Sequence, residues 1–180
     1  MKHINLNPMN PPLNWQDKLP DELPQGWGER AAALCQAQSL TAALRALGGS
    51  FTVKVLYMGE LDGQGNSFGE NHAETAAPQF VRDVLLHLDG VPVVQARSAC
   101  SPQSQAWRGV LDCGTQPLGE RLFDGTLPLK RSAFEFCLME NAGGQDDFRR
   151  PVAARRSYFD WDGEVLELTE YFLAGLAQFV

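Results

Sequence analysis

One carboxylate near the end of the chain lies in a pattern that favours chemistry. In a strand over residues 165–173 side chains alternate between faces, so Glu170 shares a face with Leu166, Leu168 and Phe172. A charge among apolar side chains costs free energy unless it is paired or has a function. Glu170 is therefore a candidate site residue. Two simpler interpretations stay open: an edge strand that leaves Glu170 in water, or two faces that differ little in polarity.

A second candidate is an arginine on an apolar face. Arg82 alternates with Phe80, Val84, Leu86 and Leu88 in a predicted strand. There it can be the buried partner of an acid or of an anionic ligand. The alternative, equally open, is an edge arginine whose stem covers apolar surface while its guanidinium group reaches water.

Cysteine and histidine chemistry has little support. The four cysteines form no C-x-x-C pair and have no histidine nearby: Cys35, Cys100, Cys113 and Cys137. Neither a zinc site nor a redox motif is expected, and the thiols are predicted to be free and buried. His3, His72 and His87 lie in no H-E-x-x-H or triad-like setting. We therefore expect no metal site.

Composition indicates one acidic domain. The 180 residues are 44% hydrophobic, enough for one core, and no low-complexity linker divides them. The net charge of −7 argues against a nucleic-acid partner, because phosphate binding draws its affinity from clustered Lys and Arg. No run of about 18 apolar residues occurs, and the N-terminus lacks the apolar core of a signal peptide. We expect a cytoplasmic monomer without a membrane span.

The elements that must position these residues can be placed along the chain. Residues 1–28 carry five prolines and are predicted to form an extended arm, with a single domain over 29–180. Ser39 is a plausible helix cap. Residues 59–79, rich in glycine, are expected to form a long loop or lid. Helical segments are predicted over residues 29–36, 39–47, 102–113 and 117–123.

Strands account for most of the remaining chain. Two Asp-Gly pairs, Asp89-Gly90 and Asp162-Gly163, indicate hairpins with two-residue turns. Because few crossover helices separate the strands, we predict an α+β fold, a single antiparallel β-sheet with helices packed to one side. The predicted strands are residues 51–57, 80–88, 91–100, 130–140, 154–161 and 164–173.

Several segments in order resemble one enzyme family, the chorismate lyases, which make 4-hydroxybenzoate for ubiquinone. They are V-L-L-H-L-D-G-V-P-V-V-Q-A-R-S (84–98), P-L-G-E-R-L-F (117–123), R-R-S (155–157) and L-E-L-T-E-Y-F-L (166–173). Ser39-Leu40-Thr41 and the following strand add a weaker match, so the resemblance spans roughly residues 30–175. Each piece alone is common, and their shared order and spacing make the resemblance specific.

The resemblance implies a fold that covers a buried ligand site, where chorismate loses pyruvate to leave 4-hydroxybenzoate without any cofactor. It places the arginine that binds the ring carboxylate at Arg97, and the essential glutamate near the 4-hydroxyl at Glu170. Backbone amides at Leu118 and Leu40 are implied to hold the same carboxylate. Arg82 is a further candidate for the site.

Two other functions stay open. By analogy the same fold occurs in small-molecule effector domains of GntR-type regulators, which would make the protein a non-catalytic binding module. The arm of 28 residues is short and poor in Lys and Arg for the DNA reader that such domains follow. The third function is a structural protein in which Glu170, Arg97 and Arg82 form a buried ion pair.

Overall fold

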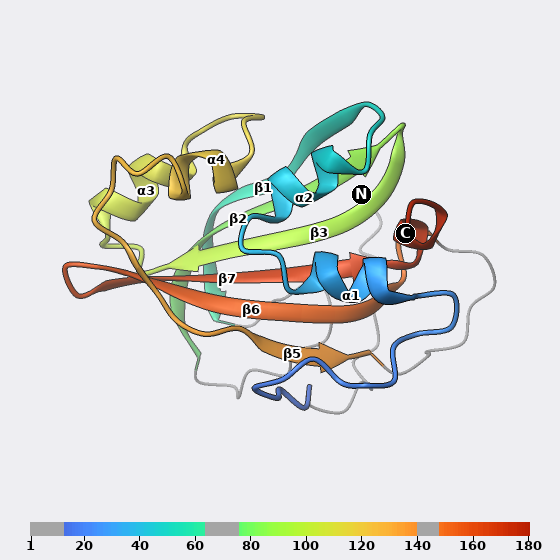
Figure 1. The fold of residues 1–180 in the computed structure, drawn as a ribbon. Coiled ribbons are helices and arrows are strands. Elements are labelled where there is room, and N and C mark those ends of the chain that lie inside the picture. Colours follow the sequence, from blue (N-terminus) through green and yellow to red (C-terminus); the bar gives the residue numbers. More distant parts are fainter. Residues whose placement is uncertain (1–12, 64–75, 140–147) are drawn as a thin grey trace, which may run out of the picture.

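Alternating side chains and two tight turns build one antiparallel sheet. The computed structural model describes residues 13–63, 76–139 and 148–180. The strands follow the spatial order β1-β2-β3-β7-β6-β4, and β5 also pairs with β6 (Figure 1). Their bounds are β1 Phe51–Gly63, β2 Ala76–Leu88, β3 Val91–Cys100, β4 Lys130–Arg131, β5 Glu135–Leu138, β6 Pro151–Trp161 and β7 Glu164–Leu173.

Both predicted hairpins are confirmed. Asp89 and Gly90 have φ of 47° and 79°, and Asp162 and Gly163 have φ of 50° and 88°. Positive φ at both central residues is the conformation that Asp-Gly favours in a two-residue turn. These turns join β2 to β3 and β6 to β7.

Two strand predictions need correction. Residues 59–61 pair with 79–81, so β1 and β2 extend into the segment predicted as a loop, because cross-strand hydrogen bonds outweigh the low strand propensity of Gly59. Residues 64–75 of that predicted loop lie outside the described residues. The predicted strand 130–140 is two short strands, each paired with β6, and residues 132–134 interrupt it.

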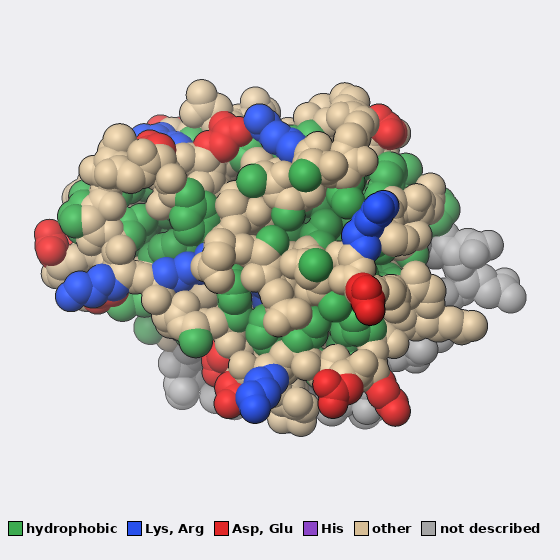
Figure 2. Space-filling view, in the orientation of Figure 1, with side chains coloured by type: hydrophobic (Ala, Val, Ile, Leu, Met, Phe, Trp, Pro, Cys, Tyr) green, Lys and Arg blue, Asp and Glu red, His purple; other side chains and the backbone are tan. Residues whose placement is uncertain are grey.

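Four short helices cover one face of the sheet, as the predicted α+β class requires. They are α1 Glu29–Cys35, α2 Leu40–Ala46, α3 Gln105–Leu111 and α4 Leu118–Leu122, and the short 3₁₀ helix η1 covers Ala174–Gln178. The Ser39 hydroxyl accepts a hydrogen bond from the Ala42 amide at 3.3 Å, which confirms the predicted cap of α2. In Figure 2 apolar side chains are visible between the helices, and most charged groups lie around the rim.

The main core lies between these helices and the sheet. Leu34, Leu44, Trp107 and Leu122 from the four helices are buried in one cluster with strand residues such as Phe172. A second, smaller cluster buries the opposite face, where Leu85, Ala154, Tyr171 and Leu173 pack together. The central strand β7 is therefore covered on both faces.

The end of the predicted arm takes part in the fold. Trp27 packs edge-on against Phe172, with ring centroids 6.2 Å apart. Gln16 forms an isolated antiparallel bridge with Phe136. Residues 1–12 lie outside the described residues.

Candidate active site

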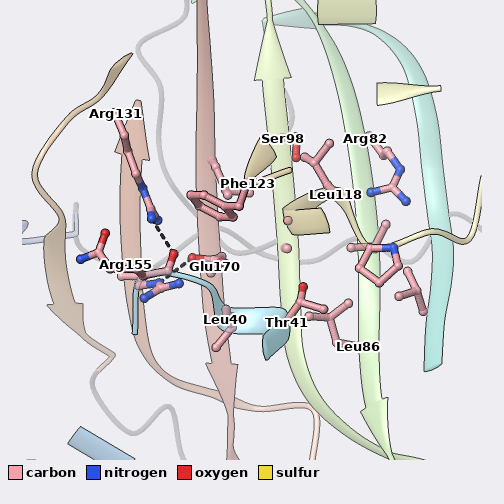
Figure 3. A pocket seen from close by; sticks show the side chains of 17 residues that line it. Leu40, Thr41, Arg82, Leu86, Ser98, Leu118, Phe123, Arg131, Arg155 and Glu170 are labelled. Carbon is pink, nitrogen blue, oxygen red and sulfur yellow. Dashed lines mark hydrogen bonds and ion pairs between the residues drawn. The ribbon is translucent and has the colours of Figure 1, made fainter. Parts of the chain in front are cut away.

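A pocket lies between the helical face of the sheet and the starts of α2 and α4 (Figure 3). The free space between its lining side chains is about 520 Å³, including the part that opens to solvent. Apolar groups from β1, β2, β3 and β7 form the floor. The hydrophilic lining residues are Gln38, Thr41, Arg82, Ser98, Arg131, Arg155 and Glu170.

Glu170 lies in the floor of this pocket. β7 runs between β3 and β6, and Glu170 is paired across the sheet with Ala96 on one side and Arg155 on the other. The residue is 7% exposed, and its Oε2 accepts a hydrogen bond from Arg155 Nε at 2.5 Å. The edge-strand interpretation is therefore wrong, and Leu166, Leu168 and Phe172 share the core face as predicted.

Arg155 holds both Glu170 and the turn between α1 and α2. Its side chain is fully enclosed, and Nη1 donates to the carbonyls of Cys35 at 2.9 Å and Ala37 at 2.6 Å. The ion pair and these carbonyls together satisfy a buried cation. The Arg155-Arg156 doublet is visible in the sequence, but its residue types alone predict no role for Arg155. The β6–β7 register, which places Arg155 opposite Glu170, is the signal that would have found it.

Arg82 is the second buried cation of the pocket. It is 2% exposed, and its Nη2 donates to the carbonyls of Gly114 at 2.8 Å and Gln116 at 3.2 Å. Nε is buried without a hydrogen-bond partner, and no acid of the described residues forms an ion pair with it. Burial lowers the pKa of Arg82, against a smaller opposite effect of Cys113. The interpretation as an edge arginine reaching water is wrong.

The structure does not bring Arg97 to this pocket. Its neighbours Ala96 and Ser98 line the pocket, so strand alternation places Arg97 on the opposite face of the sheet. There Nε and Nη2 donate to the two carboxylate oxygens of Asp83 at 2.8 and 2.7 Å. The predictions that Arg97 shares a site with Glu170, or pairs with it, are corrected on this geometry.

Arg131 is a third cation of the pocket, and its sequence context did not predict this position. It lines the pocket from β4, and its Nη1 donates to the Gln38 carbonyl at 2.6 Å. Burial lowers its pKa to about 10, with Glu170 raising and Arg155 lowering it, so the group is charged at neutral pH. In Figure 3 Arg131, Arg155 and Glu170 lie together on one side of the pocket, and Arg82 lies on the other.

The predicted backbone positions Leu40 and Leu118 both line the pocket. They are the first residues of α2 and α4, where backbone N–H groups have no acceptor within the helix. The two helix starts lie close together. A methyl group added at Gly119 would lie only 3.0 Å from the Thr41 hydroxyl.

Charge and enclosure define what the pocket can bind. Three arginines against one glutamate leave its lining with a net charge of +2. The anionic group of a small ligand can bind Arg82, which has no acid partner among the described residues, and a hydroxyl group of the same ligand can donate to Glu170 on the other side. Surroundings of low polarity strengthen both interactions. This arrangement suits an anionic ring with a hydroxyl group at its far end.

The described part of the chain offers neither a metal site nor a membrane-spanning helix. Within residues 13–63, 76–139 and 148–180, no three His, Cys, Asp or Glu side chains lie together as metal ligands would. No helix in those same ranges is long and apolar enough to cross a membrane. The four cysteines are free and buried, as predicted.

Comparison with known proteins assigns the family. The family model described as chorismate lyase matches residues 20–178. The chain belongs to the chorismate lyase family. A probable chorismate pyruvate-lyase of Ralstonia nicotianae is 33% identical over 92% of this chain and 91% of its own length. A protein of the same description from Shewanella amazonensis is 32% identical over 91% of this chain and 86% of its own length.

A solved structure gives a weaker likeness. The effector domain of PhnF from Mycobacterium smegmatis is 15% identical, with a TM-score of 0.45 over 75% of this chain and 88% of that chain. A score of this size carries no conclusion about function.

Proposed function

We propose that the protein eliminates pyruvate from chorismate and releases 4-hydroxybenzoate. The observation that carries the proposal is Arg82, a buried cation that has no acid partner within residues 13–63, 76–139 and 148–180 and that lies across the pocket from Glu170. Chorismate carries a ring carboxylate and a 4-hydroxyl on opposite ends of its ring. Family membership supports the same substrate.

Arg82 takes the role that the family resemblance implied for Arg97. Its guanidinium group binds the ring carboxylate, and the backbone amides of Leu40 and Leu118 add to this site. The 4-hydroxyl then lies toward Glu170, whose Oε1 makes no hydrogen bond with the described residues and can accept one from it. Arg155 holds the other oxygen and fixes the carboxylate in position.

The proposed reaction depends on how the substrate is positioned and needs no cofactor. The bond between C3 and the ether oxygen breaks, the proton on C4 leaves, and the departing enolpyruvate takes up a proton to become pyruvate. The ring becomes aromatic, so the step is strongly downhill and no electron acceptor is consumed. Glu170 lies beside the carbon that loses its proton and acts as a base or an orienting group there.

The proposal also covers the compartment, the oligomeric state and the pathway of the protein. The protein acts in the cytoplasm as a monomer, and its product enters ubiquinone synthesis. A bacterial strain that lacks its own chorismate lyase should regain ubiquinone when this chain is expressed, and unchanged ubiquinone content would count against that part.

One assay tests the reaction. Purified protein is incubated with chorismate, the aromatic product is identified by chromatography, and pyruvate is measured in parallel. We expect equal amounts of 4-hydroxybenzoate and pyruvate, well above spontaneous decay. A non-catalytic effector domain would instead bind 4-hydroxybenzoate without releasing pyruvate, and that result would reject the enzyme.

A further inference from the structure

Arg131 has a donor that the fold leaves unused. Its Nε donates to the Ser157 hydroxyl at 3.2 Å and its Nη1 donates to the Gln38 carbonyl at 2.6 Å. Nη2 has no hydrogen-bond partner among residues 13–63, 76–139 and 148–180, and no acid in those ranges forms an ion pair with Arg131. A half-buried cation with a spare donor is suited to a second anionic group.

Aromatic rings hold this guanidinium group in place. Its carbon lies 4.1 Å from the centroid of Phe134, 5.1 Å from that of Phe159 and 5.2 Å from that of Phe123. Cation–π contacts and two hydrogen bonds restrict the side chain, so little entropy is lost when it binds a ligand. Arg131 is therefore preorganised at the wall of the pocket.

The position of Arg131 matches one part of the substrate. The enolpyruvyl ether of chorismate is attached to the ring carbon next to the one that bears the 4-hydroxyl. If the hydroxyl lies at Glu170, the ether lies on the side of the pocket that holds Glu170, Arg155 and Arg131 (Figure 3). Glu170 already neutralises the charge of Arg155, so among the described residues Arg131 is the cation on this side that has no acid partner and can bind the carboxylate of the ether.

The charges support the same assignment. Chorismate is a dianion, whereas 4-hydroxybenzoate has one carboxylate. The pocket lining has a net charge of +2, one more than the product needs. Arg82 accounts for the carboxylate that substrate and product share, and Arg131 for the one that only the substrate has.

We infer that Arg131 binds the carboxylate of the three-carbon enolpyruvyl group, and so distinguishes substrate from product at the site proposed above. This inference rests on the proposed function and deepens it. Arg131 also balances the charge of the enolpyruvate as the C3–O bond breaks. After pyruvate leaves, the product keeps only its contacts to Arg82, Glu170 and the helix starts.

Two stable aromatic ligands test the inference without turnover. The probe 3-(carboxymethoxy)-4-hydroxybenzoate carries both carboxylates, and 4-hydroxybenzoate carries one. We expect Arg131→Gln to weaken the probe by about 10- to 100-fold, the worth of a hydrogen-bonded charge pair, and 4-hydroxybenzoate by less than about 3-fold. Calorimetric titration measures both affinities, and retained 4-hydroxybenzoate binding shows that the variant is folded.

The controls separate this inference from the proposed function. Arg82→Met should weaken both ligands alike. In the unaltered protein the probe should bind at least about 10-fold tighter than 3-(carbamoylmethoxy)-4-hydroxybenzoate, in which an uncharged amide replaces the second carboxylate and the ring carboxylate is kept. This comparison needs no variant. Equal binding of probe and amide, or equal weakening of both ligands by Arg131→Gln, would overturn the role of Arg131. Failure of the unaltered protein to bind 4-hydroxybenzoate would reject the proposed function itself.

Discussion

Arg82 and Arg97 lie on neighbouring strands and meet different partners. Arg97 has a bidentate carboxylate partner in Asp83, whereas Arg82 donates to two carbonyls and its buried Nε has no acceptor in the described part of the chain. A buried cation that lacks a counter-charge weakens the fold and gains most from an anionic ligand. The different roles proposed for the two arginines rest on these partners.

Exchanging each arginine for methionine separates the two roles. Arg82→Met should lower 4-hydroxybenzoate affinity by about 100-fold, because the ligand carboxylate loses its charged partner. Its unfolding free energy should change by less than about 1 kcal/mol, since relief of the unpaired charge offsets the lost hydrogen bonds to the two carbonyls. Titration calorimetry and urea unfolding measure the two quantities.

Arg97→Met is the matched control on the opposite face. It leaves Asp83 without its partner and should cost about 3 kcal/mol of unfolding free energy, with ligand affinity unchanged. Loss of affinity in Arg97→Met together with full affinity in Arg82→Met would return the carboxylate to Arg97.

Glu170→Gln should separate catalysis from binding. The amide keeps the shape of the side chain and can still hydrogen-bond the substrate hydroxyl, yet it accepts no proton. We expect kcat to fall by about 100-fold or more while 4-hydroxybenzoate still binds. The exchange also leaves Arg155 without its counter-charge, so the unfolding free energy should fall by about 3 kcal/mol. Turnover must therefore be measured below the lowered thermal unfolding midpoint of the variant. Near-normal kcat in the folded variant would remove Glu170 from the chemistry.

A β-bulge between β2 and β3 determines which arginine reaches the pocket. Next to the Asp89-Gly90 turn, His87 pairs with Pro92, but Leu86 pairs with Val94, so Val93 is the extra residue. Without this shift a regular hairpin would place Arg82 opposite Arg97, on one face. A one-residue shift exchanges the faces of all later residues, so Arg82 pairs with Ser98 instead.

The bulge also marks the limit of what the sequence could predict. Strand alternation correctly placed Glu170 with Leu166, Leu168 and Phe172, and the Asp-Gly pairs correctly placed both hairpins. These features depend on local geometry alone. The bulge at Val93, the pairing of Arg155 with Glu170 and the approach of Arg131 depend on contacts between distant segments, which composition and periodicity do not encode.

The Ser39 cap at the start of α2 should affect both stability and ligand binding. Ser39→Ala removes the cap and should cost about 1 kcal/mol of stability. Because Leu40 follows directly and lines the pocket, a frayed first turn should also weaken 4-hydroxybenzoate binding several-fold. Fluorescence titration and urea unfolding measure both effects.

Ser104→Ala is a matched control, because it also removes the capping hydroxyl of a helix. Ser104 caps α3 by accepting from the Trp107 amide and also contacts Glu164, while no residue of α3 lines the pocket. This variant should lose stability and keep its affinity for 4-hydroxybenzoate. Equal loss of affinity in both variants would mean that the effect reflects general destabilisation and not the position of the Leu40 amide.

The net charge of the whole chain and the net charge of the pocket lining have opposite signs. The chain carries a net charge of −7, whereas the pocket lining carries +2. The pocket therefore attracts a dianionic substrate against the net charge of the chain, and charges inside a pocket are screened less than charges on the surface. Both faces of the sheet are covered, so β7 holds Glu170 within a packed core.

Burial of thiols should make global stability fall at alkaline pH. Burial raises the pKa of Cys35 from its ordinary value of 9.0 to about 12, an effect that Arg155 opposes and Glu170 adds to. Burial likewise raises the pKa of Cys100 to about 11, with Arg108 opposing and Glu164 adding. In the unfolded chain both thiols lose their protons near 9, while in the folded protein they keep them. Their contribution to stability is therefore complete below pH 9 and is lost as the pH rises toward the folded values.

A double variant isolates this contribution. Cys35→Ala with Cys100→Ala lowers stability at every pH through lost packing, but it removes the part that depends on thiol ionisation. The difference in unfolding free energy between the original protein and the variant should shrink by about 1.4 kcal/mol per pH unit for each thiol above pH 9. Urea unfolding at intervals between about pH 8 and pH 10.5 measures this difference. A difference that stays constant over the range would show that neither buried thiol resists ionisation in the folded protein.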